Sequence, residues 1–315
     1  MTHMPEAQGN ARLVLVLSSE RSGSTLLRTL LGEHRRVVAP SELFLLRYPD
    51  YRTWRSLKPV AVDSLVEFFT LIGRPKSVAE LDATCSDWST IEVYRWMLSL
   101  LPNESFLVDK TPAYANSVET LERSRSLRPY YVWLIRHPLG VIDSYVQIKR
   151  RARAAGLAKL YRRLTGDGGD KLSSPVARHR EVKWVLQQTN IRTFLGSVLD
   201  QDKSAIRFED LVSRPLDTLR ALCQALGITM EPAMLAALDR RQKMNPALGD
   251  PNFHTHDRVV PEKAADWRAR FSERDLSFET LSLMRLLGIQ SLIVQLLSLG
   301  HYLHHLLFPT GTPLS

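Results

Sequence analysis

Short apolar runs alternate along this chain with stretches whose apolar positions recur at helical spacing. The run Leu13 to Leu17 is followed by Leu26, Leu27, Leu30 and Leu31, which lie three and four positions apart. Similar runs at 37–39, 105–108, 130–135 and 204–208 have the composition of short buried strands. Strands that alternate with helices predict an α/β fold with a central parallel sheet flanked by helices.

The rest of the chain divides around this pattern. Residues 1–11 are expected to be a loose leader, 12–272 one α/β domain, and 273–315 a helical C-terminal extension. Residues 48–59 are aromatic and basic with two prolines, and we expect a surface loop there, followed by helices over 61–101. A helix is expected over 115–125 and a long one over 175–199. Eight cations between 149 and 171 predict a basic lid, although such a run is also typical of a solvated helix face.

Between the first strand and the first helix lies a small polar loop, Ser18 to Thr25, around the single glycine Gly23. A strand, a loop of small residues and a helix start form an arrangement that binds phosphate, through free amides and the positive end of the helix dipole. The loop lacks the GxxxxGK[ST] pattern of nucleotide triphosphatases, and its cation is Arg21. An ordinary turn with an exposed arginine remains the alternative.

Further polar groups follow the other predicted strands. Glu42 comes just after the second strand, and Asp109 and Lys110 come directly after the third. Ligands of α/β sheets bind at the carboxyl ends of the strands, so these positions are candidate site residues. A turn in which Asp109 caps the next helix is the alternative there. Arg136 ends the fourth strand and Ser144 follows on the next helix, which suggests a second anion site.

The composition indicates the class of binding partner but does not identify a particular one. Lysine and arginine outnumber acids 42 to 33, a net charge of +9, which favours anionic partners. Two cysteines, no signal peptide and no long apolar span predict a cytoplasmic protein. The leucine-rich segment 281–308 is expected to form amphipathic helices that pack on the domain or a partner, with membrane-surface contact as the alternative. His254 and His256 lack a nearby third ligand, so no metal site is predicted.

The four segments SSERSGSTLL, DKTPAY, LIRHPLGVIDSY and RFEDLVSRP, in this order, resemble the sulfotransferases that use 3′-phosphoadenosine 5′-phosphosulfate (PAPS). The resemblance implies a P-loop-like α/β domain over roughly residues 12–271. It also implies that the first motif binds the 5′-phosphosulfate and that the third binds the 3′-phosphate. The residues that correspond are Arg21, Ser22, Gly23, Ser24 and Thr25 in the first motif, and Arg136 and Ser144 in the third.

Within this family the chain looks most like the bacterial branch found alone or inside polyketide and peptide synthases, on RSGSTLL, APSELFLL, DKTPAYA and DPNFHTH. Some members of that branch sulfate a β-hydroxyl on a carrier-bound acyl chain. The resemblance therefore implies a hydroxyl-bearing acceptor and, as a partner that the basic lid suits, an acidic acyl carrier protein, with no nucleic acid. Arg21, Glu42 and Lys110 also match the catalytic spacing of tyrosylprotein sulfotransferases, a secreted and disulfide-bearing branch that this chain does not otherwise resemble.

These residues define a hypothesis for sulfuryl transfer without a metal ion. Glu42 is the predicted base that takes the acceptor proton, and Arg21 and Lys110 stabilise the charge that develops. The structural alternative for Glu42 is a capping role or a salt bridge with Arg47. His137 and His254 are rival bases, but the position of His137 beside Arg136 favours a structural role for it. Two other functions stay open: a P-loop-like kinase or nucleotide hydrolase that uses ATP and magnesium, and a noncatalytic domain that binds partners.

Overall fold

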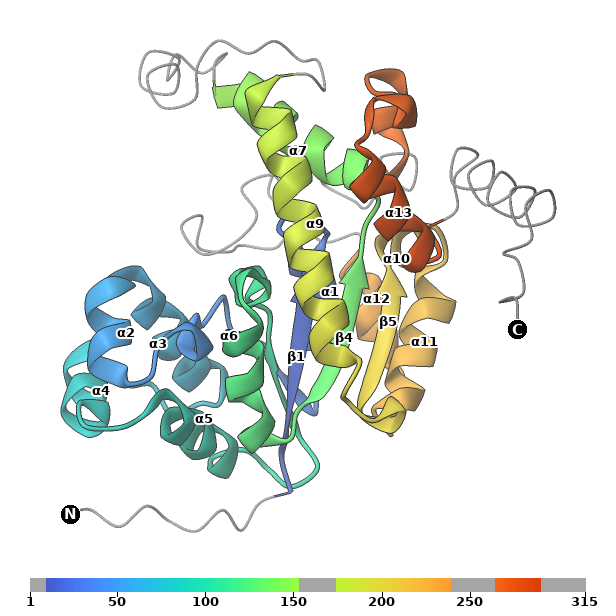
Figure 1. Cartoon of the computed structure of the whole chain (residues 1–315). Coiled ribbons are helices and arrows are strands. Elements are labelled where there is room, and N and C mark those ends of the chain that lie inside the picture. Colours follow the sequence, from blue (N-terminus) through green and yellow to red (C-terminus); the bar gives the residue numbers. More distant parts are fainter. Residues whose placement is uncertain (1–9, 153–173, 239–263, 290–315) are drawn as a thin grey trace, which may run out of the picture. The chain divides into compact units, whose positions relative to one another are not determined.

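The computed structural model describes residues 10–152, 174–238 and 264–289, drawn as coloured ribbon in Figure 1. The chain divides into two compact units. The first contains the residues up to Arg136 and those from Leu186 to Ala264, and the second contains His137 to Val185 and the residues from Ala265 onward. The predicted boundaries of a leader, a domain over 12–272 and an extension over 273–315 stay predictions.

A five-stranded parallel sheet forms the centre of the first unit, in the order β2-β3-β1-β4-β5. The first strand is therefore central, with β3 on one side and β4 on the other. The predicted α/β fold with a parallel sheet is confirmed. The strands are β1 (Arg12–Ser18), β2 (Val37–Val38), β3 (Phe106–Asp109), β4 (Tyr130–Ile135) and β5 (Lys203–Arg207).

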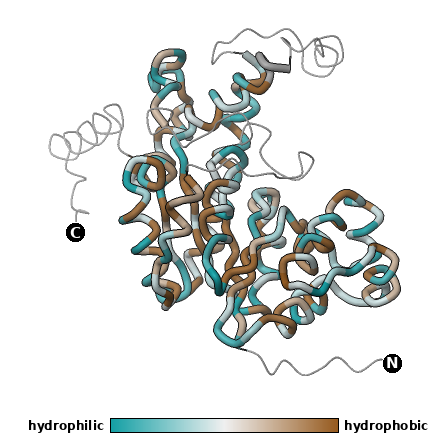
Figure 2. Tube along the Cα trace, turned by 180° about the vertical axis from the view of Figure 1, so that it is seen from behind, coloured by the Kyte–Doolittle hydropathy of each residue, from teal (hydrophilic) through white to brown (hydrophobic). Residues whose placement is uncertain are grey.

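Side chains that alternate along β1 contribute to two separate hydrophobic cores. Leu13, Leu15 and Leu17 pack with the helices of one face, whereas Val14 and Val16 pack with those of the other. Because both faces are covered, the central strands β1, β3 and β4 are mostly apolar, and much of the sheet is brown in Figure 2, whereas the edge strand β5 carries polar and charged residues. The first face carries α2 (Tyr51–Leu57), α3 (Val62–Leu71), α4 (Val78–Cys85), α5 (Thr90–Ser99) and α6 (Val118–Arg123). The second carries α1 (Ser24–Gly32), α10 (Phe208–Ser213), α11 (Pro215–Ala225) and α12 (Pro232–Ala236).

Short 3₁₀ helices connect these elements in the first unit: η1 (Leu45–Arg47), η2 (Pro59–Ala61), η3 (Pro112–Asn116), η4 (Ser124–Leu127) and η6 (Asp200–Asp202). The long helix α9 (Pro175–Leu195) contributes its last turns, from Leu186 on, to this unit. There Ile191, Phe194 and Leu195 are buried in the first core.

The second unit consists of α7 (Pro138–Ala152), the beginning of α9, η9 (Asp266–Ala269), η10 (Glu273–Asp275) and α13 (Phe278–Leu286). Within this unit a bidentate ion pair joins α7 to the residue after η9: the Arg270 guanidinium donates to both carboxylate oxygens of Asp143, at 2.6 and 2.7 Å. These hydrogen bonds raise the pKa of Arg270. The buried Glu181 accepts hydrogen bonds from the Ser277 amide and the Thr280 hydroxyl, each at 2.7 Å, and so joins α9 to the start of α13.

One local prediction is wrong, and the extent of a second is corrected. Residues 48–59 contain the helix α2, which Asp50 caps by accepting from the Thr53 amide at 2.8 Å, and which buries Tyr51 and Trp54. The helix expected over 115–125 is shorter and flanked by η3 and η4.

Several other predictions fall mostly beyond the part of the chain that the structure describes: the basic lid, most of the segment 281–308, residues 1–9 and the loop that contains His254. In the described residues, no helix is both long enough and apolar enough to cross a membrane.

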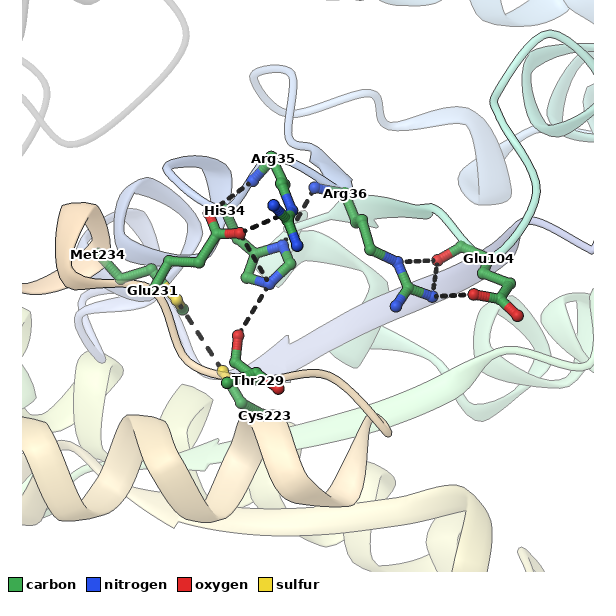
Figure 3. Close-up of polar contacts among 8 residues, drawn as sticks. All are labelled: His34, Arg35, Arg36, Glu104, Cys223, Thr229, Glu231 and Met234. Carbon is green, nitrogen blue, oxygen red and sulfur yellow. Dashed lines mark hydrogen bonds and ion pairs between the residues drawn. The ribbon is translucent and has the colours of Figure 1, made fainter.

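A histidine fixes the turn that leads from α1 into β2 (Figure 3). His34 is buried, its Nδ1 accepts from the Arg36 amide at 3.0 Å, and its Nε2 lies 3.0 Å from the Thr229 carbonyl oxygen. These partners place the proton on Nε2. Arg35 pairs with Glu231 at 3.1 Å, so the turn is tied twice to the connection between α11 and α12. The edge strand β2 is thereby held although it has only two residues.

Candidate active site

The loops that follow β1, β2 and β3 meet at the carboxyl edge of the sheet. Because β3 lies directly beside β1, the residues after Ser18 and those after Asp109 leave the sheet next to each other. The end of β4, at Arg136, flanks the other side of β1. This is where open α/β sheets bind their ligands.

The loop from Ser18 to Thr25, here called the anion loop, has the backbone of an anion-binding turn. Arg21 and Gly23 have left-handed φ angles of 65° and 85°, and Gly23 is the N-cap of α1. The amides of the first turn of a helix have no carbonyl partner within the helix, and they lie at its positive end. A phosphate or sulfate at this position therefore meets several donors at once.

Two buried glutamines of α9 form hydrogen bonds with this loop. The Ser19 and Ser22 hydroxyls lie 2.7 Å apart, and the Gln188 amide donates to Ser19 at 3.3 Å. Gln187 accepts from the Glu20 amide, also at 3.3 Å. Sequence reasoning missed both glutamines. The available signal was their position, three and four residues after Trp184 on the face where the helical spacing predicts apolar side chains.

Three of the predicted site residues meet around a buried ammonium group. Lys110 donates to the Glu42 carboxylate at 2.5 Å and to the Thr25 hydroxyl at 3.2 Å. The Lys110 side chain is only 1% exposed, whereas that of Glu42 is 19% exposed. The alternative in which Glu42 pairs with Arg47 is thus not what the structure shows, because the carboxylate pairs with Lys110. The contact joins the anion loop, the segment after β2 and the end of β3.

Asp109, next to Lys110, forms a buried network and does not cap a helix. Its carboxylate accepts hydrogen bonds from the hydroxyls of Tyr94, Tyr114 and Thr111, the last two at 2.8 Å. Burial raises the pKa of Asp109 above its ordinary value, although the hydrogen bonds oppose this. Burial also raises the pKa of both tyrosines. Asp109 therefore anchors the end of β3, while Ser117 caps α6.

Arg136 contacts the anion loop directly. Its Nη1 donates to the Arg21 carbonyl oxygen at 2.8 Å, and its guanidinium lies 4.2 Å from the centre of the Phe208 ring. Phe208 also packs so closely against Gly23 that a Cβ atom there would lie 2.3 Å from the ring. Phe208 is thus a further residue that shapes the site, in the fourth motif. Ser144 lies on α7 in the second unit, and its pairing with Arg136 around one phosphate stays a prediction.

Of the rival bases, His137 has a structural environment in the second unit. Its ring stacks on Trp267 at 4.2 Å between centroids, and its Nε2 lies 2.9 Å from Glu273. Its Nδ1 accepts from the Leu139 amide at 3.2 Å, at the start of α7. These contacts fit the structural role that the sequence favours for it. His254 lies beyond the described residues.

The donors at this edge suit an anion of the phosphate or sulfate type. They are amides at a helix start, the hydroxyls of Ser22, Ser24 and Thr25, and the cations Lys110 and Arg136. Within the described ranges, no three His, Cys, Asp or Glu side chains are grouped as metal ligands.

Fold and site together define an α/β protein of the P-loop-like class, with an oxyanion site at the carboxyl edge of a parallel sheet. The model of the sulfotransferase family matches residues 14–232, and the chain belongs to that family. It is therefore an enzyme that transfers sulfuryl groups. The resemblance predicted from the motifs is confirmed at this level.

Solved structures agree with this family. The sulfotransferase domain from the curacin biosynthetic pathway is 28% identical, with a TM-score of 0.74, and the match covers 90% of this chain and 99% of that one. The sulfotransferase domain of the Synechococcus PCC 7002 olefin synthase is 23% identical, with a TM-score of 0.72 over 92% of this chain and 98% of that one. The first of these domains comes from a biosynthetic pathway and the second from a synthase, and together with the family match they confirm the predicted resemblance to the bacterial branch. No curated protein matches the chain.

Proposed function

We propose that this sulfotransferase moves a sulfuryl group from PAPS to an acceptor hydroxyl, with Glu42 as the base. The observation that carries the proposal is the position of Lys110, whose ammonium contacts both Thr25 of the anion loop and the Glu42 carboxylate. One contact thus joins a site for an anionic donor to a group able to accept a proton. The proposal is also supported by the family, whose members generally use PAPS.

The anion loop is suited to the 5′-phosphosulfate of the donor. Arg21, Ser22, Gly23, Ser24 and Thr25 supply amides, hydroxyls and a cation there. Arg136, which already holds the loop through the Arg21 carbonyl, would bind the 3′-phosphate together with Ser144. When bound, PAPS supplies an activated sulfuryl group whose leaving group is a phosphate.

The protein's own part is positioning and charge stabilisation. Glu42 would take the proton of the acceptor hydroxyl as its oxygen bonds to sulfur. Negative charge that builds on the departing phosphate would be stabilised by Lys110, Arg21 and the amides of the helix start. As in phosphoryl transfer, such groups suffice when the reacting atoms are held in line, and no metal ion is invoked.

The acceptor we propose is a hydroxyl on a small metabolite or on an acyl chain attached to a carrier protein. The similar sulfotransferase domains from the curacin biosynthetic pathway and from the olefin synthase support an acceptor of this kind. The net charge of +9 favours an acidic carrier. The proposal includes a cytoplasmic location and no nucleic-acid partner.

Thermal unfolding with two ligands tests the donor assignment. We expect the desulfated product PAP, without metal, to raise the melting temperature of the full chain, because a ligand that binds only the folded state stabilises it by about 2.7 kcal/mol at 100 times its dissociation constant. ATP with magnesium is the comparison. A shift with ATP and magnesium alone would replace the proposal by a kinase or nucleotide hydrolase, and no shift with either ligand would contradict a preformed donor site.

A further inference from the structure

The segment that carries Glu42, here called the base segment (Ala39–Phe44), is irregular backbone between β2 and η1. It belongs to no helix or strand that could hold it by a regular ladder of hydrogen bonds. Its backbone groups must therefore find other partners. A carboxylate on such a segment is only as well placed as those partners make it.

Two side chains of α3 hold the base segment on either side of Glu42. Ser64 donates its hydroxyl to the Glu42 carbonyl oxygen at 3.0 Å. Glu67 accepts from the Ser41 amide at 2.7 Å. Residues three apart lie on one face of a helix, so α3 offers both groups to the same stretch of backbone. Ser64 is fully buried and Ser41 is 2% exposed, so water does not compete for these contacts.

Other elements fix the flanks of the base segment. The Trp54 indole donates to the Leu43 carbonyl oxygen at 2.8 Å, and Arg28 donates to the Ala39 carbonyl oxygen at 2.6 Å. Phe44, with a left-handed φ of 58°, donates its amide to the Thr111 hydroxyl at 3.4 Å. These three contacts hold Ala39, Leu43 and Phe44, whereas Ser64 and Glu67 of α3 bind the backbone at Glu42 and at the residue before it.

Charge also links Glu67 to the base. Arg28 is 5% exposed, and burial lowers the pKa of its guanidinium, although the charges of Glu67 and Glu42 oppose this. The buried guanidinium therefore feels both carboxylates. Glu67 is thus a second carboxylate, beside Glu42, that acts on the buried Arg28 guanidinium.

We infer that Ser64 and Glu67 are positioning residues that set the reach of the Glu42 carboxylate toward the acceptor. The inference rests on the proposed role of Glu42 as the base. A general base must lie within hydrogen-bond distance of the proton that it takes, and a small displacement is costly. Loss of the Ser64 or the Glu67 hydrogen bond leaves the contact between Lys110 and Thr25 unchanged. It removes a restraint on the backbone that carries Glu42, so the position of the carboxylate is less well fixed.

The test compares Ser64→Ala with Thr70→Ala in the full chain. Thr70 lies on the same helix, and its hydroxyl also donates to a carbonyl oxygen, that of Val66 at 3.0 Å, but on the exposed face. Glu67→Ala and Glu67→Gln form a second pair, because glutamine keeps an oxygen that accepts from the Ser41 amide. For each variant, PAP affinity, melting temperature, and kcat and KM with 3-hydroxybutyryl pantetheine as the acceptor probe are measured.

We expect Ser64→Ala and Glu67→Ala to lower kcat by about 10- to 100-fold, the effect of a displaced catalytic group, with PAP affinity unchanged. Thr70→Ala should keep the wild-type kcat, and Glu67→Gln should recover most of what Glu67→Ala loses. Wild-type kcat in both alanine variants, or a loss of PAP affinity that parallels the loss of kcat, would overturn the inference. A wild-type protein that binds PAP but sulfates no hydroxyl would instead overturn the proposed function.

Discussion

At the residue scale, the most informative side chain is Lys110, because a fully buried lysine is rare unless it is paired. Its ammonium has two oxygen partners, the Glu42 carboxylate and the Thr25 hydroxyl. Lysine carries three donor protons, so capacity for one more anionic oxygen remains. A side chain in this position can hold Glu42, the proposed base, in the free enzyme and stabilise a developing charge during the reaction.

Glu42→Gln tests the base. Glutamine fills the same volume and can still accept from Lys110, but it cannot take a proton at neutral pH. We expect PAP affinity to be unchanged and the turnover of an acceptor to fall by about 10²- to 10⁴-fold, the usual contribution of a general base. The control is Glu122→Gln, which removes a carboxylate from the surface pair with Arg125. Full turnover in Glu42→Gln would exclude Glu42 as the base.

Gly23 is required for two separate reasons, its left-handed backbone and the Phe208 ring against it. Gly73, at the end of α3, has a similar φ of 70° but open space around the position of a Cβ atom. The two glycines therefore separate the cost of backbone conformation from the cost of a clash. A non-glycine residue in the left-handed region costs roughly 1–2 kcal/mol.

Gly23→Ala should consequently destabilise the protein more than Gly73→Ala and should also weaken PAP binding, since the displaced ring or loop would disturb Arg136 and the amides. Gly73→Ala should lose some stability and keep its PAP affinity. Chemical denaturation and PAP titration of both variants measure these effects. Equal behaviour of the two variants would mean that the loop tolerates a side chain at Gly23.

At the element scale, the sequence was sufficient to predict where the strands lie and in which order the motifs follow them. Parallel strands buried on both faces are short apolar runs, and β1 and β4 were recognisable for that reason. The strand order itself came from the structure. Because β3 lies beside β1, Lys110 and Thr25, which follow the ends of these strands, are brought into contact.

Elements held by long-range contacts were not predictable in this way. The helix α2 carries prolines at its borders and charges on its surface, so its local pattern favours a loop. What stabilises it is tertiary: Trp54 reaches the base segment, and the Tyr51 hydroxyl donates to Asp82 at 2.7 Å. The partner of Glu42 was also missed, because Arg47 is near in sequence whereas Lys110 is near only across the sheet. Gln187 and Gln188 were overlooked for the same reason.

At the scale of the whole molecule, both cysteines of the chain are buried in the first unit, Cys85 at 0% and Cys223 at 1% exposed. Burial raises the pKa of Cys85 to about 12 and that of Cys223 to about 11. Both thiols are therefore protonated at neutral pH in the folded protein. In the unfolded chain a thiol ionises near pH 8.5.

Two consequences can be measured. At pH 8 neither thiol should react with a thiol reagent until the protein unfolds. Stability should also fall as the pH rises above about 8.5, because the unfolded chain then releases protons that the folded protein retains. Denaturant midpoints between pH 7 and pH 9.5 would show this fall, and it should be smaller in Cys85→Ala/Cys223→Ala. Rapid labelling of the native protein would contradict the burial of the thiols.

The central place of β1 in the sheet also governs how the protein can be made. Arg12 pairs with Phe106 and Val14 with Tyr130, so both neighbours of the first strand are synthesised roughly 100 residues after it, and such non-local pairing slows folding. At about 5–20 residues per second, the ribosome needs about 5–20 s to supply them. During that interval the apolar strand β1 and the proposed donor-binding loop after it lack their neighbouring strands. The first motif can therefore acquire its working shape only after the strands on either side of it, β3 and β4, have been synthesised.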